Sequence, residues 1–182
     1  MDRSPAAEAT AGTHGFPAAL TSFVGRGAAV DEVAGRLAEY RLVTVTGPGG
    51  AGKTRLAGEV ARRVAARFAD GVWLAELASV HDPAQLVPAV AAALGVRGLP
   101  LVAAADELAR ALARRQLLLV LDNCEHVIGA AAELCGRLLL GADEVALQQS
   151  MQGQFPSATP LLVLVAYAVV FSFLARRFFR WE

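Results

Sequence analysis

One segment constrains this chain more than any other: Gly47-Pro48-Gly49-Gly50-Ala51-Gly52-Lys53-Thr54. It matches the pattern G-x-x-x-x-G-K-[ST] at every position. The stretch 41–46 before it predicts a short buried strand, and the stretch 54–68 after it predicts a helix. A glycine-rich turn between a strand and a helix directs backbone N–H groups and the positive end of the helix dipole at one place. The sequence therefore predicts an α/β fold with a phosphate site at this turn.

Lys53 is the one lysine in the chain, and every other basic position holds arginine. A compact ammonium group on a flexible stem reaches between two phosphates, which a planar guanidinium does not do as well. We expect Lys53 to contact the β- and γ-phosphates of a nucleotide and the Thr54 hydroxyl to hold Mg²⁺. Residues 47–52 and Arg55 complete the predicted binding loop. The alternative, a strand-to-helix turn without a ligand, is disfavoured because strand, loop and helix all agree.

Asp122 is the predicted second half of this site. It follows the apolar run 117–121, which lacks alternation and so favours a parallel strand covered on both faces. An aspartate at the carboxyl end of such a strand is placed to help Thr54 bind Mg²⁺. The next residue is Asn123 and not a second acid, so nucleotide binding is better supported than hydrolysis. Glu125 is the nearest substitute for a catalytic acid, but it is equally well explained as a helix-start residue.

The remaining pattern alternates strands and helices. We predict a strand at 71–77 and helices at 82–94, 106–115 and 125–140, which indicates a three-layer sandwich with a parallel sheet. The net charge of zero gives no sign of a broad nucleic-acid-binding surface. Cys124 and Cys135 predict neither a disulfide framework nor, with the three histidines, a metal site.

Three ordered motifs resemble one family over residues 16–140. The segments 20–26, 44–56 and 119–126 are similar to the NB-ARC-like P-loop ATPase module of STAND signalling ATPases, found in bacterial SARP- and LuxR-type transcriptional regulators. The resemblance implies ATP or ADP with Mg²⁺, Val24 and Arg26 on the base side of the nucleotide, and a cytoplasmic module without direct DNA contacts. Gly27 stands where the family usually has an acid. The resemblance does not determine self-association.

The family pattern stops after Leu140. The expected strand that ends in a sensor arginine, and the helical lid that follows it, are not found, so we predict an incomplete sheet and slow or no hydrolysis. The missing strand would lie between the 41–46 and 117–121 strands. The alternative is that the tail supplies a substitute, for which 161–165 has suitable β-branched content.

Residues 145–175 contain no charged side chain. We predict a transmembrane helix at 158–175, after a linker at 142–157 and before a basic end at 176–182. The predicted nucleotide domain spans 17–141 and follows a flexible segment at 1–16. Residues 154–182 resemble the last transmembrane segment of an ABC-2-type permease. Two functions stay open: a nucleotide-binding signalling module with a membrane partner, or a membrane-protein fusion fragment with a vestigial ATPase portion.

Overall fold

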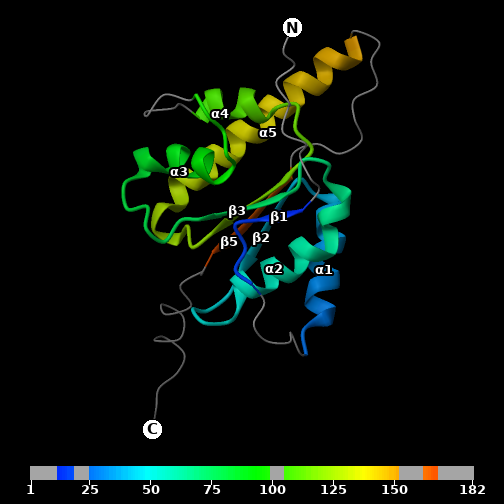
Figure 1. The fold of residues 1–182 in the computed structure, drawn as a ribbon, viewed down its shortest axis with the longest axis vertical. Coiled ribbons are helices and arrows are strands. Elements are labelled where there is room, and N and C mark those ends of the chain that lie inside the picture. The colour runs from blue at the N-terminus through cyan, green and yellow to red at the C-terminus, as the bar shows by residue number, and fades with distance from the viewer. Residues whose placement is uncertain (1–11, 19–24, 99–104, 152–161, 168–182) are drawn as a thin grey trace, which may run out of the picture.

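Five parallel strands form the centre of the protein in the computed structural model, which describes residues 12–18, 25–98, 105–151 and 162–167 (Figure 1). The strands lie in the order β1-β3-β4-β5-β2, and each neighbouring pair is parallel. Their bounds are Thr13–His14 (β1), Leu42–Thr46 (β2), Val72–Glu76 (β3), Leu118–Asp122 (β4) and Leu162–Tyr167 (β5).

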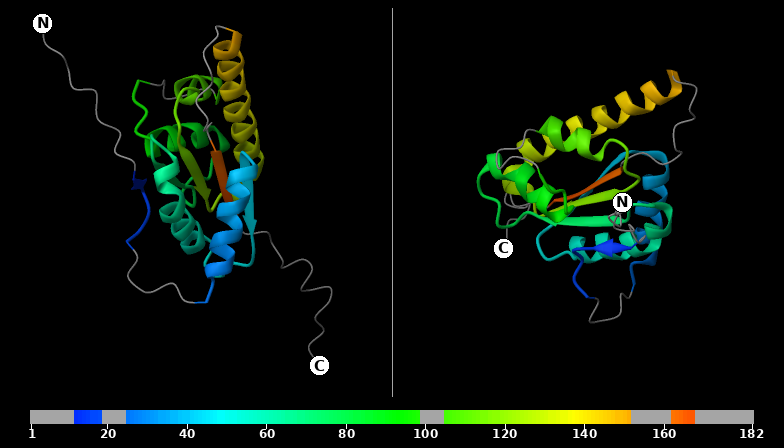
Figure 2. Two further views of the ribbon diagram at one scale, coloured as in Figure 1. Left: turned by 90° about the vertical axis from the view of Figure 1, so that its right-hand side faces the viewer. Right: turned by 45° about the horizontal axis from the view of Figure 1, so that its top comes forward.

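Helices cover both faces of this sheet (Figure 2). On one face lie α1 (Gly27–Glu39) and α2 (Lys53–Val64). On the other face lie α3 (Leu86–Ala93), α4 (Ala105–Leu112) and α5 (Ile128–Met151). Short 3₁₀ turns occur at Ala65–Arg67, Pro83–Gln85 and Glu125–Val127. The predicted three-layer α/β sandwich with a parallel sheet is therefore confirmed.

Strand β4 separates two hydrophobic cores. All five of its residues are buried. Leu118 and Val120 belong to the core under α1 and α2, whereas Leu119 and Leu121 belong to the core under α3, α4 and α5. Because successive side chains of a strand point to opposite faces, a strand covered on both sides is apolar throughout. The unbroken apolar run before Asp122 reflects this position.

Strand β5 corrects the expected architecture of the tail. It lies between β2 and β4, with Val163 in register with Leu42 on one side and Leu119 on the other. The prediction of a sheet lacking its strand between β2 and β4 is therefore wrong. The alternative of a substitute strand at 161–165 is confirmed over 162–165, and the strand continues to Tyr167. The physical reason is the backbone: β2 and β4 each present polar groups that an apolar, β-branched segment between them can pair.

The predicted transmembrane helix at 158–175 is accordingly wrong over 162–167, which are extended. Its other residues and the basic end at 176–182 lie outside the described part of the chain. Among the residues described, no helix is both long enough and apolar enough to cross a membrane.

Three further elements differ from expectation. Helix α5 continues to Met151, through the first ten residues of the predicted 142–157 linker. Helix α1 was not predicted. Strand β1 lies inside the predicted flexible 1–16 segment, where Thr13 pairs with Val72 and the His14 ring stacks on Trp73 at 3.9 Å.

Candidate functional site

The loop from Gly47 to Gly52 joins β2 to α2 at the carboxyl edge of the sheet (cyan in Figure 1). Gly50 and Gly52 have φ values of 72° and 76°, in the left-handed region that glycine adopts without a steric penalty. Gly52 is also the residue that immediately precedes α2. The loop thus leads directly into a helix N-terminus, where the first backbone N–H groups have no partner within the helix.

Lys53 folds back over this loop. Its Nζ atom donates hydrogen bonds to the carbonyl oxygens of Gly47 (3.1 Å) and Pro48 (2.9 Å). The ammonium group is therefore held at the mouth of the loop by two neutral acceptors. An anionic phosphate is a stronger acceptor for the same group than a carbonyl, so these two bonds are exchangeable.

Thr54 and Asp122 come together from the two halves of the predicted site. The Thr54 hydroxyl donates a hydrogen bond of 2.5 Å to Oδ2 of Asp122, while Oδ1 accepts the Asn123 N–H at 3.0 Å. One hydroxyl and one carboxylate beside a phosphate loop are the oxygen ligands that Mg²⁺ uses with nucleotides, so these residues fit that ion. In the described part of the chain, no group of three or more His, Cys, Asp or Glu side chains forms another metal site.

Asp122 is almost fully buried, with 1% of its surface exposed. Burial raises the pKa of its carboxyl above the ordinary value, and the negative charge of Glu76 acts in the same direction. The hydrogen bonds from Thr54 and Asn123 and the charge of Lys53 lower that pKa in part. A divalent cation between Thr54 and Asp122 would favour the ionised carboxylate and remove this penalty.

Glu76 is a site residue that the sequence analysis did not select. It ends β3, in register with Asp122 on β4, and its Oε1 accepts a hydrogen bond of 2.9 Å from Nδ2 of Asn123. Asn123 has a positive φ of 55°, which is uncommon for a residue with a side chain. The sequence held a partial signal, because Glu76 is the one acid in the predicted 71–77 strand and lies one residue before its end.

Arg26 lies beside the loop. Its Nη1 atom donates a hydrogen bond to the carbonyl oxygen of Ala51, and its backbone carbonyl accepts the first N–H groups of α1. Arg55 is in the first turn of α2, directly after Thr54. Val24 lies outside the described residues. Glu125 begins the 3₁₀ turn after β4, is exposed, and makes no hydrogen bond to another described residue.

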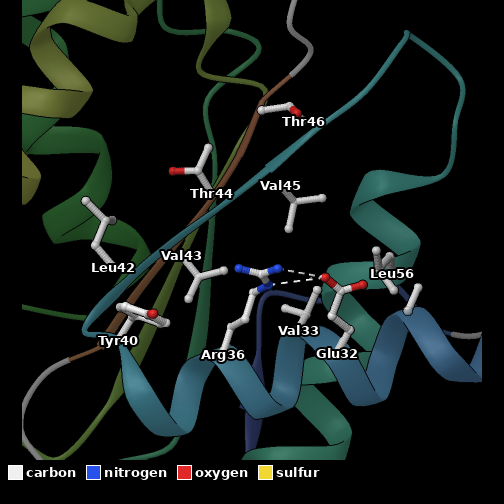
Figure 3. Close-up of a pocket in the computed structure, with 11 residues that line it drawn as sticks. Glu32, Val33, Arg36, Tyr40, Leu42, Val43, Thr44, Val45, Thr46 and Leu56 are labelled. Atoms are coloured by element: carbon white, nitrogen blue, oxygen red, sulfur yellow. Dashed lines mark hydrogen bonds and ion pairs between the residues drawn. The ribbon is translucent and has the colours of Figure 1, made fainter.

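A separate groove of about 540 Å³ lies between α1 and β2 and is lined up to Thr46, the residue before the loop (Figure 3). Leu42 and Val45 of β2 line it opposite Val33 and the Glu32–Arg36 ion pair of α1. No residue of the loop from Gly47 to Thr54 contributes to its wall. This groove is therefore distinct from the candidate phosphate site.

The parallel sheet, the glycine loop before α2 and the Thr54–Asp122 pair together define a P-loop NTPase fold. The chain belongs to the AAA domain family, whose model matches residues 37–162.

Curated relatives share this region. An uncharacterized protein of Mycobacterium tuberculosis is 42% identical over 120 residues, which is 66% of this chain and 30% of that protein. A second protein of M. tuberculosis, provisionally named an HTH-type transcriptional regulator, is 39% identical over 111 residues, or 61% of this chain and 12% of that protein. The chain therefore spans less than a third of the length of either relative.

A solved structure of the Aeropyrum pernix ORC2 protein, in ADPNP–ADP complexes, has a similar fold with a TM-score of 0.51. It is 21% identical, and the match covers 86% of this chain and 44% of that one. At this identity the likeness concerns the fold alone.

Proposed function

We propose that this chain is the nucleotide-binding module of a signalling ATPase of the STAND type, taking ATP or ADP together with Mg²⁺ at the Gly47–Thr54 loop. The observation that carries the proposal is the Thr54–Asp122 hydrogen bond, which joins the loop to the carboxyl end of β4. A glycine-rich turn without a ligand has no need for a buried carboxylate at that position, because burial makes its ionised form costly.

The signalling role rests on two lines of support. The ordered motifs at 20–26, 44–56 and 119–126 resemble STAND modules, and one relative is provisionally named an HTH-type transcriptional regulator. This chain spans 12% of that relative, and in this proposal DNA binding belongs to other parts of such a protein. In this proposal the nucleotide acts as a switch by binding two conformations with different affinity.

Turnover is slow in this proposal. Asn123 replaces the acid that often follows the metal-binding aspartate, and an amide does not accept a proton from water. Arg26 contributes by holding the loop through Ala51, and the predicted contact of Val24 with the base remains part of the proposal.

Membrane attachment is not proposed. Its main support was an uncharged stretch whose residues 162–167 form the strand between β2 and β4. A parallel central strand is apolar for the same reason that β4 is, so lack of charge does not require lipid.

Calorimetric titration with ATP and ADP, with and without Mg²⁺ and in buffer without detergent, tests the proposal. We expect micromolar affinity that is lost in Lys53→Ala. Arg114→Ala removes one positive charge from an exposed position after α4 and is the matched control. An unchanged affinity in Lys53→Ala, or no binding by the parent protein, would show that the loop does not hold a nucleotide.

A further inference from the structure

The carboxyl edge of the sheet carries a row of polar side chains from three elements. Thr54 at the start of α2 bonds to Asp122 at the end of β4. The next residue, Asn123, bonds to Glu76 at the end of β3, which is the strand beside β4. The row therefore continues past the predicted metal ligands and ends on a second carboxylate.

The Glu76 carboxylate is fixed on one side only. Its Oε1 atom accepts two hydrogen bonds of 2.9 Å, one from Nδ2 of Asn123 and one from the backbone N–H of Ala78. Two donors on one oxygen set the orientation of the carboxylate. The described residues offer no hydrogen bond to Oε2, and the residue is exposed, so this oxygen is available to a water molecule.

Glu76 and Asp122 differ in burial and in the number of carboxylate oxygens that are hydrogen-bonded. Asp122 is buried and already bonded at both oxygens, by Thr54 and by the Asn123 N–H. Glu76 is exposed and has one oxygen without a partner among the described residues. A residue that positions a water molecule needs an oxygen that the water can reach, which Glu76 has and Asp122, buried and bonded at both oxygens, does not.

We propose that Glu76 is the catalytic acid–base residue of this site and that Asn123 is its positioning residue. This inference rests on the proposed nucleotide site and extends it from binding to hydrolysis of a nucleoside triphosphate. In this proposal Glu76 is the catalytic acid, a role for which the sequence analysis offered only Glu125.

The step is a hydrolysis. Oε2 of Glu76 accepts a hydrogen bond from the water molecule whose oxygen attacks the γ-phosphorus. The new P–O bond forms as the bond between that phosphorus and the β,γ-bridging oxygen breaks, and the nucleoside diphosphate leaves with the bridging oxygen. The proton of the water passes to Glu76 and then to the released phosphate, so no other reactant is needed.

The test measures single-turnover ATP hydrolysis and ATP affinity side by side in the full chain. Glu76→Gln keeps an oxygen that can accept the Ala78 and Asn123 bonds but removes the base. We expect it to lower the hydrolysis rate at least tenfold while the Kd for ATP stays within about threefold, since a general base typically contributes more than that. Glu76→Asp, which keeps the charge on a shorter stem, should be intermediate.

Asn123→Ala should lower the rate about threefold to tenfold without changing the Kd, because Glu76 loses one of its two orienting donors. Glu133→Gln removes the same charge from an exposed position on α5 and is the matched control. Thermal melting of each variant shows whether the fold is retained.

Several results would overturn the inference. One is a rate for Glu76→Gln within twofold of the parent, and another is a loss in Glu125→Gln in its place. A third such result is an equal loss of ATP affinity and of hydrolysis rate in both Glu76 variants, which would show that Glu76 has a structural role. If the parent binds ATP but hydrolyses it no faster than Lys53→Ala, the inference fails and the nucleotide site stands. Absence of ATP binding would instead remove the proposed function itself.

Discussion

Thr54 and Asp122 lie 68 positions apart in the sequence and are joined by a hydrogen bond of 2.5 Å. The bond places a hydroxyl at the start of α2 against a carboxylate at the end of β4, so oxygen atoms from a helix and a strand lie side by side. Magnesium would replace the shared proton contact by two metal–oxygen contacts, directly or through water. In the proposed function, the pair would link metal binding to nucleotide binding.

Thr54→Ala should weaken ATP affinity about tenfold or more when Mg²⁺ is present, a loss of ~1.4 kcal/mol or more. In EDTA the same substitution should change affinity little, because the hydroxyl then has no ion to hold. Thr54→Ser keeps the hydroxyl and serves as the control. Titrations in the two buffers distinguish the cases, and an equal loss in both would contradict a metal-binding role for Thr54.

Lys53 offers a chemical test, because the α-amino group of Met1 is the one other amine in the chain. An amine-acylating reagent followed by mass spectrometry should label both groups in the free protein. Saturating ATP should slow acylation of Lys53 about tenfold or more and leave Met1 unaffected, since a bound phosphate would replace the carbonyl acceptors of Lys53. Equal labelling with and without ATP would place the nucleotide elsewhere.

Arg26→Ala should weaken ADP affinity about threefold to tenfold, or ~0.6–1.4 kcal/mol. The reason is that its guanidinium holds the Ala51 carbonyl, and a loop freed from this contact must be ordered when nucleotide binds. Arg36→Ala, which breaks an ion pair with Glu32 within α1, is the control and should leave affinity unchanged. Equal effects of the two variants would indicate general damage to α1.

The two cysteines make stability depend on alkaline pH. Burial raises the pKa of Cys124 to about 11 and that of Cys135 to about 12, against an ordinary value of 9.0. In the unfolded chain both thiols lose their protons near pH 9, whereas the folded protein keeps them. The unfolded state then binds fewer protons, so stability should fall as pH rises from 9 towards 11 for Cys124 and towards 12 for Cys135, with a slope that approaches about 1.4 kcal/mol per thiol per pH unit inside that window.

Urea unfolding at pH 7, 9 and 10 measures this loss. A variant with both cysteines replaced by alanine should lack the thiol contribution to the slope. Alkylation by iodoacetamide at pH 8 should be slow in the folded protein and fast in urea. Rapid alkylation without urea would contradict the burial of these thiols.

Leu164→Pro should destabilise the protein by ~3 kcal/mol or more. Leu164 is in register with Val43 on β2 and Val120 on β4, and proline has no N–H for a ladder on either side. Ala105→Pro, at the first residue of α4 where proline is tolerated, is the matched control. In buffer without detergent, amide hydrogens of 162–167 should exchange slowly in the parent. Fast exchange there would contradict the central position of β5.

The site residues that could be predicted from the sequence are those that belong to short motifs of consecutive residues. Lys53 and Thr54 belong to one eight-residue motif, and Asp122 follows a five-residue apolar run. Helix α1 was also within reach, because its buried residues Val30, Val33 and Leu37 follow helical spacing. Glu76 was missed because its hydrogen bond to Asn123, the residue after β4, becomes apparent only when β3 and β4 are known to be neighbours.

Strand β5 was harder to predict for a physical reason. An uncharged, apolar segment satisfies its backbone equally well as a helix in lipid or as a central strand between two others. The choice is made by unpaired edges on β2 and β4, which are about 75 residues apart in sequence. The residues of 162–167 alone therefore do not predict that β2 and β4 will have unpaired edges.

The place of β5 also sets the order in which this protein can mature. The ribosome makes β5 last of the five strands, yet β5 separates the strand that carries the phosphate loop from the strand that carries Asp122. Until it is made, β2 has no neighbour in the sheet and the two halves of the site have no fixed spacing. Such late, non-local pairing is slow and exposes apolar edges while it lasts. The emerging chain would accordingly be a client for chaperones, and nucleotide could be captured only after residues 162–167 have been made.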